Sequence, residues 1–112
     1  MKIDSQDRQG VRILSPKGKI TIGEGDIALR EAVQTALEDG ARNMVINLEG
    51  TSTIDSSGIG ELVSAFTSVK NRGGALKLVH LPPKVHDILQ ITQLVTVFEV
   101  YDNEDEALAS FN

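Results

Sequence analysis

The sequence contains no cysteine. This absence excludes a disulfide framework, a thiol nucleophile and any zinc or iron–sulfur site that needs cysteine ligands. A chain without thiols fits the reducing cytosol, and we expect a cytoplasmic protein.

Long hydrophobic runs and an excess of basic residues are also missing. The first ten residues hold one lysine and no apolar stretch, unlike a secretory signal. No segment approaches the roughly 18 apolar residues that a membrane helix needs. Lys and Arg number 11 against 16 Asp and Glu, so the formal net charge is −5. This balance disfavours nucleic acid and membranes as partners.

The length and composition predict one globular domain. Domains typically run about 100–200 residues, and a chain of this size buries roughly two-thirds of its unfolded surface. Hydrophobic residues make up 40% of the 112 residues, which is typical of globular rather than disordered chains. We expect residues 1–112 to form a single domain without linkers or repeats.

The N-terminal part of the chain predicts β-strands. Residues 11–14 form a β-like run that ends at Ser15-Pro16, and residues 18–22 are either its continuation or a second short strand. Ile3 is a weak candidate for an edge strand, because acidic residues surround it.

A helix and a buried strand are expected next. Apolar residues between 29 and 37 recur at helical spacing, with Asp26 as a candidate N-cap and Gly40 as a C-terminal stop. Residues 44–48 (MVINL) are almost continuously apolar, which favours a central strand covered on both faces. We expect a polar turn after this strand.

Helices and strands alternate in the rest of the chain. They are a helix over residues 59–69, a strand over 76–79, a helix over 85–89, a strand over 98–101 and a last helix after Asn103. Asn103 and Glu106 resemble a capping box. The alternation predicts an α/β fold with a mixed, mostly parallel sheet of four to five strands and about four flanking helices.

The most informative segment is DSSGIG, residues 55–60, between the expected central strand and a clear amphipathic helix. Ligand and modification sites in open α/β sheets favour the carboxyl ends of strands. A helix N-terminus there presents unpaired N–H groups and partial positive charge, which suit a phosphate group. The two serines are therefore candidate modification sites.

A simple helix cap is the alternative interpretation of this segment. It would account for Asp55 or for one of the two serines. The capping-box pattern fails, however, because Ile59 and Gly60 stand three residues after Ser56 and Ser57. Each glycine in the first turn costs about 1 kcal/mol of helix propensity relative to alanine, so we infer that something approaches the backbone closely there.

The same residues resemble the signature of the STAS family, and specifically of bacterial anti-sigma factor antagonists. In that family an Asp-Ser-Ser/Thr-Gly-aliphatic-Gly turn follows the central strand, as residues 47–49 (NLE) and 54–60 (IDSSGIG) do here. The resemblance covers nearly the whole chain. It includes Gly18-Lys19-Ile20 before the first helix, Gly73-Gly74 before the next strand and Phe98 before the acidic last helix.

The resemblance implies regulation by partner switching. The unmodified antagonist binds an anti-sigma factor that is also a serine kinase, and so releases a sigma factor. The kinase phosphorylates the serine directly after the aspartate, which is Ser56 in this chain, and a metal-dependent serine phosphatase reverses the reaction. A phosphate on Ser56 would lower the net charge to about −7 and oppose binding through repulsion and desolvation.

The implied partner surface centres on this turn. Ser57 is the less favoured phosphate acceptor and is expected to help cap the helix instead. Close relatives often carry aspartate where Thr21 stands, so Thr21 is either a second hydroxyl at this surface or a strand-end residue without a role. The expected partner-binding residues are Thr21, Asp55, Ser56, Ser57, Gly58, Ile59, Gly60 and Glu61.

Catalytic and metal sites are not predicted. His80 and His86 lack a carboxylate at ligand spacing, and the serines lack the glycine-framed elbow of hydrolases. We expect a protein without enzymatic activity, metal or cofactor that is a monomer or weak homodimer. The alternatives within the same family are a scaffold or signalling component of a larger assembly, and a protein that binds a small ligand or nucleotide.

Overall fold

The structure is a computed structural model that describes residues 1–111. Its elements are β1 (Lys2–Arg8), β2 (Val11–Ile20), α1 (Gly25–Glu38), β3 (Asn43–Asn47), β4 (Thr51–Ile54), α2 (Ser56–Asn71), β5 (Ala75–Val79), α3 (Pro83–Ile91), the short 3₁₀ helix η1 (Leu94–Thr96), β6 (Glu99–Tyr101) and α4 (Glu104–Ala109).

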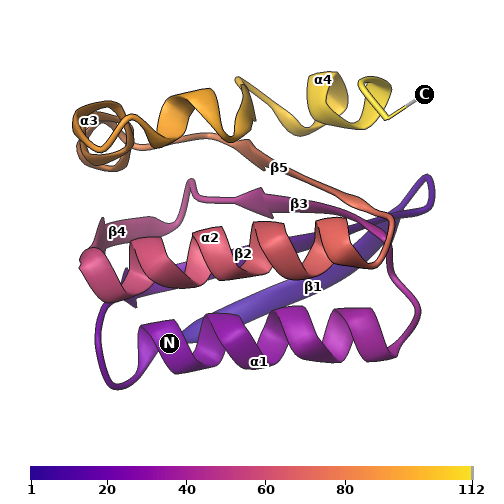
Figure 1. The fold of residues 1–112 in the computed structure, drawn as a ribbon, viewed down its shortest axis with the longest axis horizontal. Helices are drawn as coiled ribbons and strands as arrows, with labels where there is room; N and C mark the ends of the chain where they lie inside the picture. Colours follow the sequence, from indigo (N-terminus) through magenta and orange to yellow (C-terminus); the bar gives the residue numbers. More distant parts are fainter. Residues whose placement is uncertain (112) are drawn as a thin grey trace.

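The strands form one mixed sheet in the order β1-β2-β3-β5-β6, with β4 paired to β2. β1 runs antiparallel to β2, whereas the other neighbours are parallel. Figure 1 shows α1 and α2 lying side by side, with α4 on the far side of β5. The predicted α/β class, the mostly parallel sheet and the four helices are confirmed, whereas the sheet has six strands and not the expected four to five.

Strand β2 is longer than the sequence indicated, because it continues through Pro16. β3 pairs with β2 over Val11–Leu14, and β4 pairs with it over Gly18–Ile20. The carbonyl of Pro16 faces Thr51. The nitrogen of a strand residue points to the same side as its carbonyl, so the Pro16 nitrogen lies between the segments of β2 that pair with β3 and with β4. The missing N–H of proline costs no ladder bond there. The predicted strand end at Pro16 is therefore wrong, and the continuation is right.

Strand β4 lies where the sequence predicted only a polar turn. Its first and last residues, Thr51 and Ile54, are buried at 2% and 4% exposure. The Thr51 hydroxyl donates to the carbonyl of Pro16 at 3.4 Å, which satisfies this buried polar group. A four-residue strand with three hydroxyl side chains carries little hydrophobic signal, so its pairing with β2 decides the conformation.

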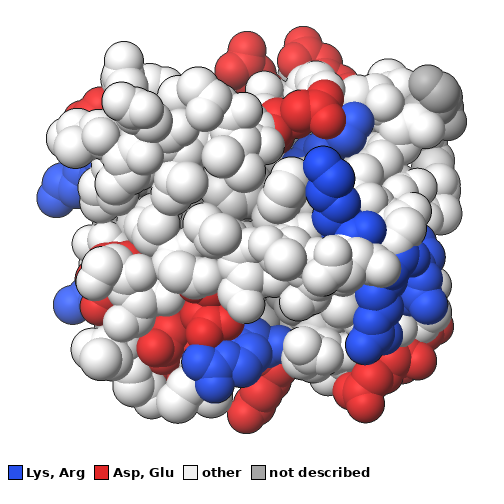
Figure 2. Space-filling view, in the orientation of Figure 1, with Lys and Arg blue, Asp and Glu red and all other residues white. Residues whose placement is uncertain are grey.

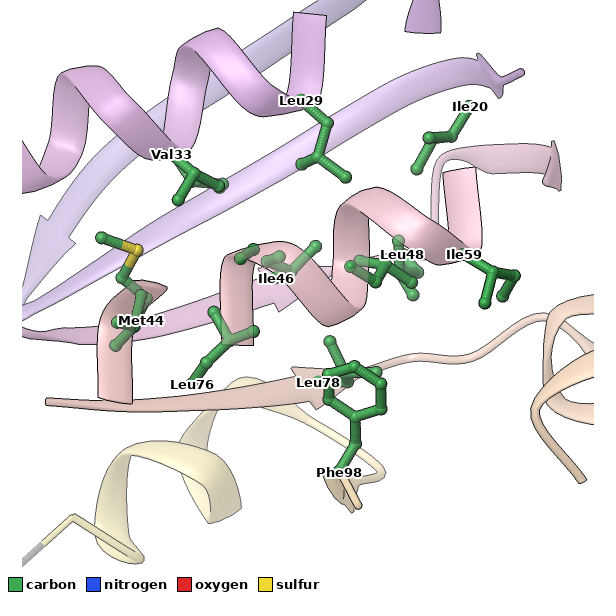
Figure 3. Close-up of a cluster of buried hydrophobic side chains, with 14 of the residues drawn as sticks. Ile20, Leu29, Val33, Met44, Ile46, Leu48, Ile59, Leu76, Leu78 and Phe98 are labelled. Carbon is green, nitrogen blue, oxygen red and sulfur yellow. The ribbon is translucent and has the colours of Figure 1, made fainter. Parts of the chain in front are cut away.

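Two apolar clusters cover the two faces of the sheet. Figure 3 shows part of the larger one, in which Leu29 and Val33 of α1 lie with residues of the strands and of α2. The smaller cluster lies under α4, whose Ala107 and Leu108 pack on the opposite sheet face. Asn103 caps α4 by accepting from the Glu106 N–H, as the sequence predicted.

A buried lysine anchors the end of α4. Lys77 of β5 is 5% exposed, and its Nζ donates to the Ser110 hydroxyl at 2.7 Å and to the Ser110 carbonyl at 3.2 Å. The same ammonium lies 4.4 Å from the centroid of the Phe111 ring. This arrangement satisfies a carbonyl at the end of α4 and gives the buried charge its partners.

Candidate functional site

The predicted turn and the loop after β2 lie at the same edge of the sheet. β2 and β4 are parallel neighbours, so the loop over residues 21–24 and the start of α2 both leave from their carboxyl ends. This is the edge at which α/β sheets place their sites. The N–H of Asp55 donates to the carbonyl of Ile20 at 3.3 Å, which joins the two segments.

Asp55 is the N-cap of α2. Its backbone is extended, with φ −109° and ψ −173°, and its Oδ1 accepts from the N–H of Gly58 at 2.9 Å. This bond satisfies one of the free N–H groups at the helix start. The expectation that Ser57 helps to cap the helix is therefore wrong, because Ser57 already lies inside the first turn.

The second carboxylate oxygen of Asp55 holds the loop after β2. Oδ2 accepts from the backbone N–H of Ile22 at 2.9 Å. The bonds from Gly58 and Ile22 favour the ionised carboxylate, so they lower the pKa of Asp55 below its ordinary value. Asp55 thus carries a persistent negative charge, and both of its oxygens are engaged by backbone groups.

Gly58 is required by internal packing. A Cβ atom at this position would lie 2.2 Å from the carbonyl oxygen of Ile20 and 2.5 Å from Cγ1 of Ile54. The first turn of α2 therefore sits directly against β2 and β4, and only glycine leaves room for this approach. Packing accounts for Gly58 without a partner, so its predicted role in partner binding stays a prediction.

Gly60 differs, although it belongs to the same motif. It is exposed, and a Cβ atom there would have nothing within 4 Å. Ser56 is also exposed and stands four residues earlier, so the two share one face of α2. The helix backbone is consequently bare beside the candidate acceptor serine.

The other residues of the predicted surface are placed differently. Ile59 is 8% exposed and belongs to the larger core cluster, so its side chain faces the interior. Glu61 is bound by Arg30 of α1, whose Nε donates to Glu61 Oε1 at 3.0 Å. This hydrogen bond raises the pKa of Arg30. Ser57 is half-buried.

Thr21 follows directly after β2 and is half-buried. Its carbonyl accepts from the N–H of Asp26 at 3.1 Å, and the loop places it next to Ile22, which Asp55 holds. The structure therefore brings Thr21 close to the DSSGIG turn. Whether its hydroxyl serves a partner stays a prediction.

The prediction that Asp26 is the N-cap of α1 is wrong. The helix begins at Gly25, and Glu24 occupies the cap position, but its side chain binds the N-terminal ammonium of Met1 instead of an N–H group of the helix. Oδ1 of Asp26 instead accepts from the N–H of Gly23 at 3.0 Å and from that of Ile27 at 2.7 Å. The buried carboxylate of Asp26, at 8% exposure, thereby stabilises the loop through its backbone N–H groups.

Two exposed isoleucines beside this site were not singled out from the sequence. Ile22 is 75% exposed in the loop, and Ile27 in the first turn of α1 is 42% exposed. Ile22 continues an alternating pattern with Ile20, and this alternation predicts a strand through Ile22, whereas β2 ends at Ile20. The two glycines that follow, Gly23 and Gly25, were the available signal that the strand had ended.

The outer face of α2 carries little charge. Figure 2 shows a mostly uncharged band across the middle of the molecule, where Figure 1 places α2. The charge of Glu61 is compensated by Arg30. Within residues 1–111 no group of three or more His, Asp or Glu side chains could hold a metal ion. No helix in the same range is sufficiently long and hydrophobic to span a bilayer.

Comparisons with known proteins place these features in context. The family model described as "STAS domain" matches residues 2–107. An anti-sigma F factor antagonist of Paenibacillus polymyxa is 24% identical over 96% of this chain and 92% of its own. An anti-sigma-B factor antagonist of Bacillus subtilis is 35% identical over 70% of this chain and 74% of its own. The structure of the Bacillus cell fate determinant SpoIIAA in its phosphorylated form has a TM-score of 0.75 and 19% identity, covering 99% of this chain and all of the other.

Proposed function

This chain belongs to the STAS domain family, and from that premise we propose that it is an anti-sigma factor antagonist. In this proposal the unmodified protein binds an anti-sigma factor with serine kinase activity and releases a sigma factor. The kinase phosphorylates Ser56, and a metal-dependent serine phosphatase restores the binding form. The protein itself acts by binding, without catalysis, in the cytoplasm and as a monomer or weak homodimer.

The position of Ser56 is the observation that carries the proposal. Its side chain is exposed at the first residue of α2, next to the bare backbone of Gly60. A kinase must bring ATP and its own main chain close to the acceptor hydroxyl, and a helix face without a Cβ atom leaves room for that approach. The named relatives support the proposal, since they are antagonists and one structural neighbour has a phosphorylated form.

The physical basis of the switch is charge on an uncharged surface. A phosphoserine adds about −1.5 to −2 charge at neutral pH. The N–H groups at the start of α2 and the helix dipole accommodate this charge within the protein, so the fold tolerates it. A partner that covers Ser56 would have to desolvate the phosphate, next to the persistent charge of Asp55. The modification therefore acts on binding.

The first experiment locates the phosphate. The purified chain is incubated with ATP and each anti-sigma factor kinase encoded in its source genome, and fragment-ion mass spectrometry assigns the modified residue. We expect phosphate on Ser56, its loss in Ser56→Ala and its retention in Ser57→Ala. Phosphate confined to Ser57, or found outside residues 55–60, would contradict the assignment.

The second experiment measures affinity for the same kinase by calorimetry. Ser56→Ala should bind like the unmodified chain, and Ser56→Asp should bind at least tenfold more weakly. Ser57→Asp is the matched control, because it adds the same charge one residue away on the half-buried side of α2. Equal affinities of Ser56→Ala and Ser56→Asp would rule out the charge mechanism. A nucleotide titration of the chain alone tests the small-ligand alternative.

A further inference from the structure

We propose that Ile22 is the apolar anchor that the anti-sigma factor kinase buries when it docks on this chain, and that Asp55 is the positioning residue that holds Ile22 in place. This inference rests on the proposed function. It adds the chemistry of the partner, which must offer an apolar pocket beside its nucleotide site.

The exposure of Ile22 has no explanation within the folded chain. Its side chain is 75% exposed, whereas Ile20, two residues earlier, is completely buried. Ile27, in the first turn of α1 after the loop that carries Ile22, is a second exposed isoleucine, at 42% exposure. When a partner buries an aliphatic side chain of this size, apolar surface is removed from water, and this favours binding.

Three of the hydrogen bonds that hold this loop lie at Thr21, Ile22 and Gly23. Asp55 accepts from the Ile22 N–H at 2.9 Å, Asp26 accepts from the Gly23 N–H at 3.0 Å, and the Asp26 N–H donates to the Thr21 carbonyl at 3.1 Å. A fixed loop loses little conformational entropy when it binds. Ile22 is therefore presented to a partner in a preorganised position.

Ile22 also lies within the area that a kinase acting on Ser56 must cover. Asp55 precedes Ser56 directly in the chain and bonds the backbone of Ile22. A specific protein interface covers about 800 Å² on each partner, and a single hydrogen bond joins Ile22 to the residue before Ser56. A kinase centred on Ser56 will thus contact the loop, and the exposed aliphatic side chain there is the group that can fill a pocket.

Val97 provides a control far from the proposed site. It is 41% exposed and lines a hollow with Phe66, Lys70 and Gly74, at the opposite end of α2 from Ser56. Replacement of either exposed aliphatic residue by serine leaves the buried core intact. If the two variants differ in affinity for the kinase, the difference therefore shows which of the two positions the kinase contacts.

The test compares Ile22→Ser with Val97→Ser in two measurements. The first is affinity for the kinase loaded with ADP, which cannot phosphorylate the chain. The second is kcat and KM for phosphorylation of Ser56 with ATP. We expect Ile22→Ser to weaken binding about tenfold or more and to raise KM with kcat little changed, while Val97→Ser stays near the wild type. Equal affinity of the wild type and Ile22→Ser, or equal losses in both variants, would overturn the inference. If the kinase neither binds nor modifies the wild type, both the proposed function and this inference fail.

Asp55→Asn tests the positioning role. The asparagine keeps one carbonyl oxygen for the Gly58 N–H, but its amide group cannot accept from Ile22. We expect faster hydrogen exchange at the Ile22 amide and weaker binding to the kinase. The double variant with Ile22→Ser should lose less affinity than the sum of the two single losses, because both changes remove the same anchor. Strict additivity would overturn the positioning role.

Discussion

The carboxylate of Asp55 accepts a hydrogen bond from the backbone of Ile22, across 33 positions of sequence. The same carboxylate caps α2 through Gly58. One side chain therefore fixes both the helix that begins with the candidate acceptor serine and the neighbouring loop, which makes the arrangement of the site depend on a single ionised group.

The ionisation of Asp55 predicts a pH-dependent stability. Hydrogen bonds from Gly58 and Ile22 lower its pKa in the folded state, so its contribution is present above the ordinary value of about 4 and is lost as the pH falls through the lower folded value. We expect the free energy of unfolding of the wild type to exceed that of Asp55→Asn at pH 6. Urea titrations between pH 6 and pH 2.5 should show the gap narrowing, and a constant gap would contradict the assignment.

The two glycines of the motif predict opposite effects on stability. Gly60→Ala should stabilise the fold by about 1 kcal/mol, because alanine favours the helix and its methyl group meets nothing. Gly58→Ala should destabilise it, because the methyl group would collide with the carbonyl of Ile20. Thermal unfolding of both variants tests this pair. A destabilised Gly60→Ala would show that the helix face is not bare.

Gly60→Ala should also weaken binding to the kinase despite its more stable fold. The added methyl group occupies the space beside Ser56 that the proposed partner approaches. Affinity measured by calorimetry checks this result. Unchanged affinity would show that the partner does not approach the helix at this point.

The Arg30–Glu61 pair predicts an electrostatic effect without phosphorylation. Arg30→Ala leaves the carboxylate of Glu61 uncompensated in the second turn of α2, directly after Gly60 in the chain. We expect weaker binding of the unmodified chain to its kinase and recovery in the Arg30→Ala/Glu61→Gln double variant. Stability should change by about 1 kcal/mol or less in either variant, because the Arg30 side chain is 58% exposed. Failure of the second substitution to restore binding would argue against a charge effect.

Lys77 predicts a local change at the C-terminal helix. Lys77→Met keeps the aliphatic stem and removes both bonds to Ser110. We expect hydrogen exchange of the α4 amides to accelerate about tenfold or more, while amides of β3 and β5 stay protected. Uniform acceleration throughout the sheet would instead show that Lys77 supports the whole core.

The sequence was sufficient for features that depend on local patterns. The helical spacing of apolar residues located α1 and α2, and Asn103 with Glu106 identified the cap of α4. The DSSGIG turn was also placed correctly between a strand and a helix. These signals lie within a few residues of each other, so no knowledge of the tertiary structure was needed.

The features that the sequence did not reveal depend on distant contacts. β4 exists because β2 extends far enough to pair with it, and Asp55 reaches Ile22 only in the folded chain. Gly58 and Gly60 look equivalent in the sequence, yet only Gly58 is packed against β2. Both glycines follow the same short sequence pattern, and only contact with β2 in the folded chain distinguishes Gly58 from Gly60.

The division of β2 between two parallel partners has a consequence for the order of folding. β2 pairs with β1 along one side and with β3 and β4 in succession along the other. Three of the five other strands, β1, β3 and β4, therefore cannot form their hydrogen bonds to β2 until β2 is extended. The pairings of β2 with β3 and β4 also join segments that are distant in the sequence. We therefore expect β2 to lie at the centre of the folding nucleus. The loop that carries Ile22 follows directly after β2, so the proposed recognition surface adjoins the strand that pairs with β1, β3 and β4.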